Sequence, residues 1–307
     1  MAWIKKNIIF KTPGNQEWSR THTQVPTALV LEDKIRIYYA TRDSKSRSLT
    51  SFIDVSRDNP ENILYIHDKP VLELGECGTH DEDGVMVGCV VKKDSHVLMY
   101  YTGWSKKQTV PYRVSIGLAK SEDNGLTFKR LFAGPVVDRT MHEPYMTMSP
   151  YVIHENDFWE MWYGSGTQWV LIEGRMEPVY VIKYACSDDG IHWIQKNTTC
   201  IEALHSHEAN TRPSLLKTSS GYEMWFSHRH IIDYRTGKGG YRIGYALSTD
   251  GKKWTRQPDQ ADLTITKDSW DSQMLAYPNV IEIENKKIMF YNGDGFGQSG
   301  FGYFIWE

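Results

Sequence analysis

The chain has 307 residues and a net charge of −3 at pH 7, and 13% of its residues are aromatic. The negative net charge and the lack of a basic stripe argue against nucleic acid as a partner, and no apolar run approaches the ~20 residues of a membrane-spanning helix. Four cysteines without CxxC spacing predict reduced, mostly buried thiols in a cytoplasmic protein.

An aromatic phrase repeats along the chain. Residues 2–10 come first and have the pattern of a strand rather than of a signal peptide, because no apolar segment with a small-residue cleavage site follows. An aromatic pair then closes an apolar strand at residues 37–39, 99–101, 161–163, 224–226 and 289–291. The last residues of these phrases are 62, 62, 63 and 65 positions apart (39, 101, 163, 226, 291). This regular period predicts a repeat architecture.

Each repeat places the same elements around the aromatic phrase. An apolar run and a polar turn precede it, and a third strand such as 113–119 or 242–247 follows. The central repeats then contain a turn phrase at 121–128, 187–193 and 248–254, in which a glycine supplies a positive φ and an aromatic residue begins an outer strand. Four short antiparallel strands per repeat predict the blade of a β-propeller.

The repeats predict one domain, because a blade buries its faces only against neighbouring blades. The last repeat reaches three strands before the chain ends, so we expect residues 2–10 to supply its outer strand and to close the ring. The expected fold is therefore an all-β, five-bladed β-propeller over residues 1–307. Its blades are expected at about 21–75, 80–137, 142–203, 207–265, and 270–307 together with 2–10.

Polar side chains gather just before the first strand of each repeat, where a propeller has the mouth of its central funnel. These segments are 21–26, 80–85, 142–145, 207–213 and 270–273, the last leading to Tyr277. Four of them carry a histidine and four carry a carboxylate, although charges are usually avoided at the start of a buried strand. A second ring of residues is expected at the same face, in the loops that begin three residues after each aromatic phrase. Its members are Arg42, Trp104, Gly166, Arg229 and Asp294.

Carboxylates from different blades suit glycoside cleavage, which uses two carboxyl groups about 5–9.5 Å apart. The candidate catalytic residues are Asp83, Glu143, Glu208 and Asp271, with Glu208 and Asp83 as the preferred pair. The expected partner is a small carbohydrate or a nucleotide sugar. Its candidate binding residues are His22, Gln24, Arg42, His80, Trp104, His142, His207, Arg212, Arg229, Tyr277 and Asp294.

The histidines leave two other functions open. His22, His80, His142 and His207 recur at steps of 58, 62 and 65 and could converge on a divalent metal ion, as in a metal-dependent lyase or epimerase. A wide propeller mouth argues against this, because ligands must lie about 2 Å from one ion. The glycoside hydrolase interpretation needs no cofactor. The other alternative is a non-catalytic propeller that binds carbohydrate.

The chain resembles the five-bladed propeller glycosidases, namely glycoside hydrolase families 43, 32, 68 and 130. The resemblance rests on the five-unit period, the Ser-x-Asp-Gly-x-x-Trp turns and the carboxylates that head the first strands, and it covers nearly the whole chain. Residues 208–226 and 270–302 also resemble uncharacterised bacterial members of this superfamily that are associated with surface-polysaccharide gene clusters. The resemblance implies a hydrolase of carbohydrate metabolism or polysaccharide biosynthesis.

The catalytic motifs of these families are not present at the matching positions. Where family 43 has an aspartate before proline, this chain has Val25 before Pro26, and Ser149 stands in the place of the second aspartate. The glutamate phrase of that family falls at 211–213, which reads Thr-Arg-Pro. The turn at 121–128 is also similar to the Asp-box of sialidases, and Arg42, Arg212, Arg229 and Tyr277 could imitate the arginine cluster and tyrosine of those six-bladed enzymes.

Overall fold

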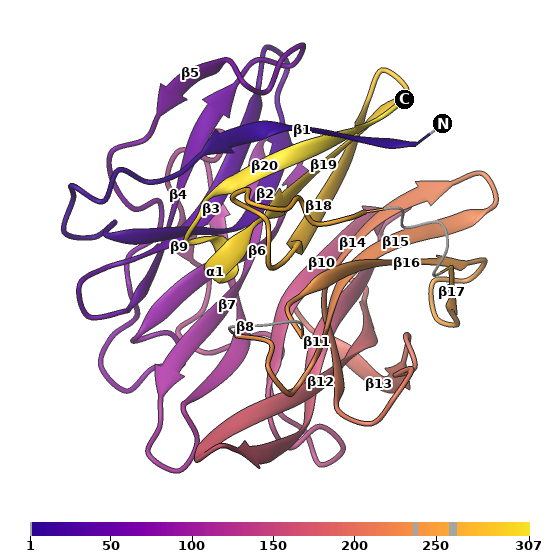
Figure 1. Cartoon of the computed structure of the whole chain (residues 1–307). Coiled ribbons are helices and arrows are strands. Elements are labelled where there is room, and N and C mark those ends of the chain that lie inside the picture. The colour runs from indigo at the N-terminus through magenta and orange to yellow at the C-terminus, as the bar shows by residue number, and fades with distance from the viewer. Residues whose placement is uncertain (1, 236–238, 258–262) are drawn as a thin grey trace.

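The computed structural model describes residues 2–235, 239–257 and 263–307, and the regular secondary structure in them is almost entirely β-strand. Figure 1 shows several twisted sheets that follow one another in chain order around a common centre. One short helical turn, α1 (Asp294–Gly297), lies between the last two strands. Among the described residues, no helix has the length and apolarity to cross a membrane.

Three sheets have four antiparallel strands each. In sheet order they are β10 (Thr147–Glu155), β11 (Phe158–Ile172), β12 (Arg175–Ser187) and β13 (Ile194–Thr199); β14 (Glu208–Thr218), β15 (Gly221–His230), β16 (Arg242–Ser248) and β17 (Thr255–Arg256); and β18 (Ala276–Ile283), β19 (Lys286–Asn292), β20 (Phe301–Trp306) and β1 (Trp3–Phe10). The predicted repeat at 207–265 includes 236–238 and 258–262, which lie outside the described residues.

The other strands form two groups that meet at one point. They are β2 (Thr21–Val30), β3 (Ile35–Arg42), β4 (Ser48–Val55) and β5 (Ile63–Ile66), followed by β6 (Gly84–Lys93), β7 (His96–Lys106), β8 (Tyr112–Ser121) and β9 (Lys129–Arg130). Among the strand residues that the structure describes, only Ser48 and Gly84 pair between the two groups. The first strands of successive groups, β2, β6, β10, β14 and β18, contact one another in this order, and β18 also contacts β2.

The N-terminal strand completes the last sheet, as the sequence predicts. β1 pairs with β20 in antiparallel register, with Trp3 opposite Trp306, and the two chain ends meet through the backbone bonds of Ala2 and Glu307. The Lys5 ammonium adds an ion pair with Asp271, at 2.5 Å. Residues from both ends of the sequence therefore share one sheet.

The repeated turn phrases connect neighbouring sheets, which explains their regular spacing. Gly125, Gly190 and Gly251 adopt φ angles of 82°, 76° and 70°, as predicted. The carbonyl of each glycine accepts a hydrogen bond from an aromatic phrase in an earlier strand group, namely from the hydroxyls of Tyr38 and Tyr100 and the indole N–H of Trp162. A side chain at the glycine would collide with the aromatic donor; a Cβ at Gly125, for example, would lie 2.1 Å from the Tyr38 hydroxyl.

Each first strand contains a β-bulge in its N-terminal half. The register shifts fall after Gln24 in β2, Val87 in β6, Met148 in β10, Thr211 in β14 and Ala276 in β18. Proline has no N–H for the ladder, so a bulge accommodates it. Four bulges place a non-glycine residue before proline at a positive φ: Val25 (51°), Ser149 (51°), Arg212 (52°) and Tyr277 (57°). Such strain is retained where the side chain is needed in a particular direction.

The cysteines are free thiols, and three of the four (Cys89, Cys186 and Cys200) are buried while Cys77 is exposed. This agrees with the prediction of mostly buried thiols. Desolvation raises the pKa of the Cys89 thiol to about 11. Cys89 is therefore a protonated packing residue at neutral pH.

Candidate functional site

A cavity of about 360 Å³ lies where the first strands of the five groups converge. Every group contributes side chains to it, so the predicted convergence of the repeats on one space is observed. The lining residues are Gln24, Val25, Arg42, Ser46, Ser48, Asp83, Met86, Trp104, Ser105, Lys106, Pro111, Tyr112, Met148, Ser149, Arg175, Tyr180, Thr211, Arg229, Tyr234, Arg235, Tyr241, Tyr277 and Phe296. Aromatic and cationic side chains are prominent among them.

The bulges of the first strands help to form this cavity. Val25, Ser149 and Tyr277, three of the four strained residues, line it. The fourth, Arg212, is fully buried next to the lining residue Thr211. Val25 and Ser149, the two positions that the resemblance to family 43 matches to aspartates, thus both line this cavity.

Arg212 joins three of the central strands. Its guanidinium donates to the carbonyls of Gly88, at 2.5 Å, and of Pro26, at 3.2 Å, and to the hydroxyl of Thr27, at 2.7 Å. No carboxylate of the described residues lies within 4.0 Å of it. Burial lowers the pKa of Arg212 to about 10, so the group still carries a positive charge at neutral pH.

Arg229 is a second buried guanidinium, held by tyrosines. Its Nε donates to the hydroxyls of Tyr180 and Tyr241, at 3.1 and 3.2 Å, and its charge lies 3.6 Å from the ring centre of Tyr234. Burial raises the pKa of these three tyrosines. They therefore remain neutral at physiological pH, and their faces stabilise the cation without neutralising it.

Arg235 is paired with Glu177, unlike Arg229. Two guanidinium nitrogens of Arg235 bond the carboxylate at 2.8 and 3.0 Å, and the Tyr234 hydroxyl also donates to it. Arg175 lies 3.4 Å from the same carboxylate. Burial alone would raise the pKa of Glu177, but the bonds from Arg235 and Tyr234 lower it, so Glu177 is ionised and its charge is shared by two arginines.

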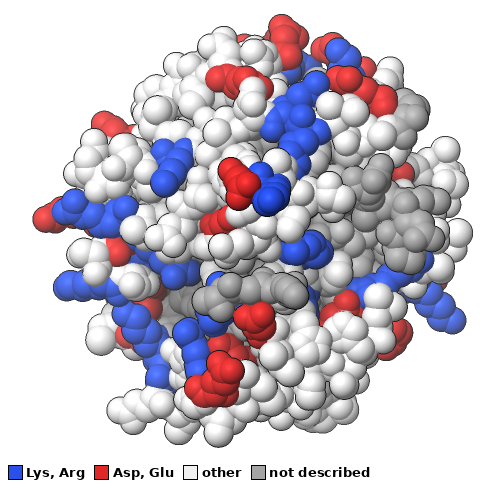
Figure 2. Space-filling model, in the orientation of Figure 1, with Lys and Arg blue, Asp and Glu red and all other residues white. Residues whose placement is uncertain are grey.

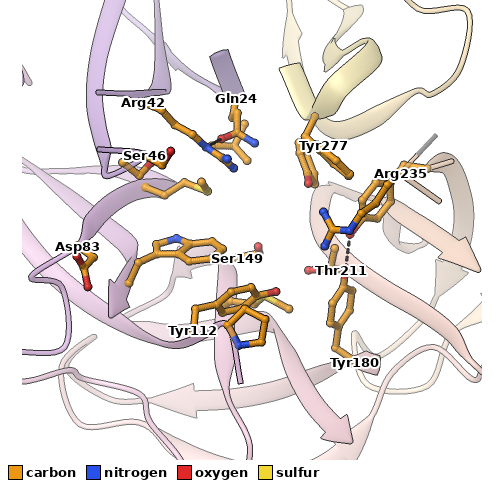
Figure 3. Close-up of a pocket in the computed structure, with 18 of the residues that line it drawn as sticks. Gln24, Arg42, Ser46, Asp83, Tyr112, Ser149, Tyr180, Thr211, Arg235 and Tyr277 are labelled. Carbon is orange, nitrogen blue, oxygen red and sulfur yellow. Dashed lines mark hydrogen bonds between the residues drawn. The ribbon is translucent and has the colours of Figure 1, made fainter. Parts of the chain in front are cut away.

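Arg42 lies in the cavity without a carboxylate partner among the described residues. Its Nε donates to Oε1 of Gln24 at 3.1 Å, and its two terminal nitrogens have no hydrogen-bond partner in that part of the chain. Burial lowers the pKa of Arg42, and the positive charge of Arg235 acts in the same direction. Figure 3 shows Arg42 and Arg235 reaching into the cavity from different sides.

Asp83 is the only carboxylate among the described residues that line the cavity. It lies just before β6, where its Oδ2 accepts the backbone N–H of Lys106 at 2.8 Å. The Lys106 ammonium is 3.8 Å from Oδ1, and the Asp83 side chain is 23% exposed. Figure 3 places Asp83 at the edge of the cavity opposite Arg235.

The other three predicted catalytic carboxylates occupy a different position in the fold. Glu143, Glu208 and Asp271 are buried, do not line the cavity, and correspond to Asp81 rather than to Asp83. The steps from 81 to 143, 208 and 271 are 62, 65 and 63, which match the repeat period. Asp83 is thus an additional carboxylate two residues further along the chain.

These four buried carboxylates form the same network in their sheets. The hydroxyls of Tyr101, Tyr163 and Tyr291 donate to Asp81, Glu143 and Asp271. Phe226 occupies the corresponding position beside Glu208 and has no hydroxyl, and there His228 lies 3.3 Å from the carboxylate. A cation further out in each sheet completes the network: Arg130 of β9 (2.7 Å), Lys183 of β12 (4.0 Å), Arg256 of β17 (3.0 Å) and Lys5 of β1 (2.5 Å). The carboxylates therefore connect the first strand of each sheet to its outer part.

The predicted binding residues are found in two environments. Gln24, Arg42, Trp104, Arg229 and Tyr277 line the cavity, and their role in binding stays a prediction. Asp294 instead holds a loop, because its carboxylate accepts the backbone N–H groups of Ser272, Gln273 and Met274.

The four histidines do not line the cavity. His80 bonds the Ser115 hydroxyl at 3.0 Å, His22 bonds Thr21, and His142 and His207 are exposed. Within the described ranges, no three histidine, cysteine, aspartate or glutamate side chains form a group suited to a metal ion. The metal-dependent alternative therefore stays a prediction without a cluster to support it.

The burial of His22 can be tested through the pH dependence of protein stability. Burial and the charge of Arg42 lower its pKa from 6.5 to about 4. Between these values the unfolded chain binds the proton and the folded chain does not, so the free energy of unfolding should fall as the pH decreases from 6.5 to about 4. We expect His22→Asn to lessen this loss in urea titrations, with the exposed His142→Asn as control. An unchanged pH slope in His22→Asn would contradict the burial of this imidazole.

A second cavity adjoins the first. It shares Lys106 and Tyr112 with the first cavity and adds Tyr145 and Trp169, and its remaining lining includes Lys107, Arg113 and Arg139. The Tyr112 ring packs edge-on against Trp169, at 5.4 Å between centroids. Tyr145 is exposed and Tyr112 and Trp169 are half-buried. Accessible aromatic rings beside polar groups are suited to contact with the apolar faces of sugars.

Several cavity residues lie outside the repeat and were not predicted. Arg175 and Tyr180 belong to the hairpin of β11 and β12, whose ladder continues to Ile172 and Arg175. Tyr234 and Arg235 lie in the loop after β15. The segment between the third aromatic phrase (161–163) and its turn phrase (187–193) is long, and its length could have indicated an extended hairpin. Its length does not indicate which side chains face the centre.

Comparison with known proteins gives close relatives and a shared fold. No protein-family model matches the chain. Two proteins of Mycobacterium tuberculosis, uncharacterized protein MT1551 (strain CDC 1551 / Oshkosh) and uncharacterized protein Rv1502 (strain ATCC 25618 / H37Rv), are each 37% identical over 309 residues, covering 100% of this chain and of the relative.

Solved structures of glycoside hydrolases have the same fold. A glycosyl hydrolase from Bacteroides ovatus has a TM-score of 0.72 at 16% identity, covering 100% of this chain and 94% of that one. A thermostable family-43 glycoside hydrolase has a TM-score of 0.68 at 16% identity, covering 96% and 90%. A GH130-family structure, reported with hydrolases that target β-1,2 mannosidic linkages, has 0.71 at 14% identity, covering 100% and 94%. The expected resemblance to this superfamily is confirmed for the fold.

Proposed function

Because the chain belongs to the same family as the Mycobacterium tuberculosis proteins MT1551 and Rv1502 and has the fold of propeller glycoside hydrolases, we propose that it is a carbohydrate-active enzyme built on a closed five-bladed β-propeller. Five strand groups in chain order, and first strands that contact one another from β2 round to β18 and back, support this architecture. The cavity at their centre is then the active site.

The proposed reaction is hydrolysis of a glycoside, with Asp83 as the proton donor. The single observation that carries this proposal is a carboxylate at the edge of an aromatic cavity that all five strand groups build. Trp104 and Tyr112, whose ring centroids are 4.5 Å apart, provide apolar faces on which a sugar ring can stack. The neutral tyrosine hydroxyls provide hydrogen bonds to sugar hydroxyls.

In the proposed step, the Asp83 proton moves to the glycosidic oxygen while the bond between that oxygen and the anomeric carbon breaks. Water adds to the anomeric carbon and releases a proton to solvent. The Asp83 carboxylate takes up a proton from solvent, which completes the hydrolysis and restores the acid. The adjoining cavity, with Tyr145 and Trp169, would hold the next sugar of the substrate or the leaving group.

A non-catalytic carbohydrate-binding propeller is the second candidate. One observation favours it. Most glycosidases use two carboxyl groups, whereas Asp83 is the only carboxylate among the described residues that line this cavity. A binding protein needs the aromatic and polar lining but no proton donor.

A panel of nitrophenyl glycosides tests the two candidates. We expect at least one member to release nitrophenol in a protein-dependent, saturable manner, and the parent sugar to inhibit that release. Thermal-shift measurements on the same sugars are made in parallel. Stabilisation of the protein by a sugar without release from any member of the panel would favour the binding propeller and would overturn the hydrolase proposal.

A further inference from the structure

The cavity holds an excess of positive charge that the proposed hydrolysis does not require. Among the described residues, five cations line it: Arg42, Lys106, Arg175, Arg229 and Arg235. Only two carboxylates oppose them, Asp83 in the lining and Glu177 behind it, so three positive charges remain uncompensated among the described residues. The buried Arg212 adds a fourth below the cavity.

This excess is local rather than a property of the whole protein. The chain carries a net charge of −3, and Figure 2 shows basic and acidic side chains mixed over the visible face. Buried or half-buried cations without a partner are costly, because desolvation disfavours the charged form. A fold that gathers several of them around one cavity is suited to an anion that enters it.

Arg42 is positioned to make the direct contact. Gln24 accepts a hydrogen bond only from the Nε of Arg42, so the two terminal nitrogens of Arg42 are available on the cavity side. Arg235 approaches from the loop after β15, and Glu177 fixes its guanidinium by two bonds. Figure 3 shows the two arginines facing the space between them. A planar guanidinium binds a carboxylate or a phosphate by two parallel hydrogen bonds.

We propose that the cavity recognises an acidic sugar, whose carboxylate or phosphate group is held by Arg42 and Arg235 with Arg229 behind them. This inference rests on the proposed function and specifies its substrate class. The acidic group lies at the arginine side of the cavity and Asp83 at the opposite edge, so that the scissile bond faces Asp83.

The test compares matched neutral and acidic sugars by calorimetric titration. The pairs are glucose with glucuronate, galactose with galacturonate, and mannose with mannuronate, each at low and at high salt. In at least one pair we expect the acidic sugar to bind about 10- to 100-fold more tightly, because a charge-assisted bidentate contact is gained. We expect this preference to shrink as salt is added.

Variants of Arg42 test whether the preference for acidic over neutral sugars arises in the cavity. Arg42→Met should abolish the preference for the acidic sugar, and Arg42→Lys should restore part of it, because lysine keeps the charge but not the planar fork. Arg57→Met is the matched control, since Arg57 pairs with the exposed Glu284 elsewhere on the protein. Equal affinity for the acidic and the neutral member of all three pairs would overturn the inference.

Binding of inorganic phosphate is measured as a separate part of the experiment. Binding of free phosphate that depends on Arg42, without any preference within the sugar pairs, would assign the arginines to a free anion and would also overturn the inference. Failure of the inference is distinct from failure of the proposed function. Turnover of neutral glycosides alone would leave the hydrolase standing, whereas Arg42-dependent binding of acidic sugars without any turnover would leave only the anion site.

Discussion

The Asp83→Asn variant is expected to lose about 10²- to 10⁴-fold in kcat on glycosides with a sugar leaving group, because a general acid contributes about this factor. Asparagine keeps an oxygen that can accept the Lys106 backbone N–H, which Asp83 accepts at 2.8 Å. The local turn is therefore retained while the transferable proton is removed. The measurement is kcat and KM at saturating substrate, together with the melting temperature.

The leaving group makes this prediction specific for an acid. Nitrophenolate is a weak base and departs with little protonation, so nitrophenyl glycosides should lose much less activity in Asp83→Asn than substrates with a sugar leaving group. A residue that merely shapes the cavity would slow both kinds of substrate equally.

Asp94→Asn is the control for the Asp83 variant. Asp94 is exposed in the turn between β6 and β7, within the same group of strands and away from the cavity, and its φ of 52° is tolerated by asparagine. Wild-type kcat in Asp83→Asn on all substrates would remove Asp83 from the mechanism, and with it the only carboxylate in the described lining.

The strands were predictable because their sequence signals are local and repeated. An aromatic pair such as Tyr100 and Tyr101 recurs at a constant period, and the turn glycines need a positive φ wherever that turn occurs. The pairing of residues 2–10 with the last sheet followed from a missing strand in the last repeat, and the structure has it. These features depend on few long-range details.

The candidate site was predictable only where it follows the repeat. Arg42, Trp104 and Arg229 have corresponding positions in different repeats, and all three line the cavity. Tyr180 and Arg235 lie in segments that occur in one repeat only, so periodicity cannot place them. The periodicity also cannot separate a catalytic carboxylate from one that connects strands, since both would recur at the mouth of each blade.

Glu208 is the residue for which this distinction matters most. The sequence favours it as a catalytic carboxylate, and such a residue could be replaced by glutamine at little cost in stability. In the structure its side chain is buried, and Arg256 bonds it through both terminal nitrogens, at 3.0 and 3.0 Å from Oε1. The backbone N–H of Leu204 and the ring of His228 complete its contacts.

We therefore expect Glu208→Gln to be strongly destabilising. Removing one partner of a buried ion pair costs about 3–5 kcal/mol, because the other charge is left without compensation. With an unfolding entropy of about 2.1 cal/mol/K per residue, a loss of about 3 kcal/mol lowers the melting temperature of a chain of this length by about 5 °C. Differential scanning calorimetry measures the change, and Glu202→Gln, an exposed position in the segment before β14, is the control.

The pH dependence of the same variant supplies an independent test. Burial alone would raise the pKa of Glu208, but bonds from His228, Leu204 and Arg256 lower it from 4.5 to about 2. The stability that this carboxylate contributes is present above pH 4.5 and is lost as the pH falls from 4.5 towards 2, since the unfolded chain binds the proton first. Glu208→Gln should flatten this acid limb. A variant with the wild-type melting temperature and acid limb, but without turnover, would instead return Glu208 to the catalytic role that its place at the head of β14 first suggests.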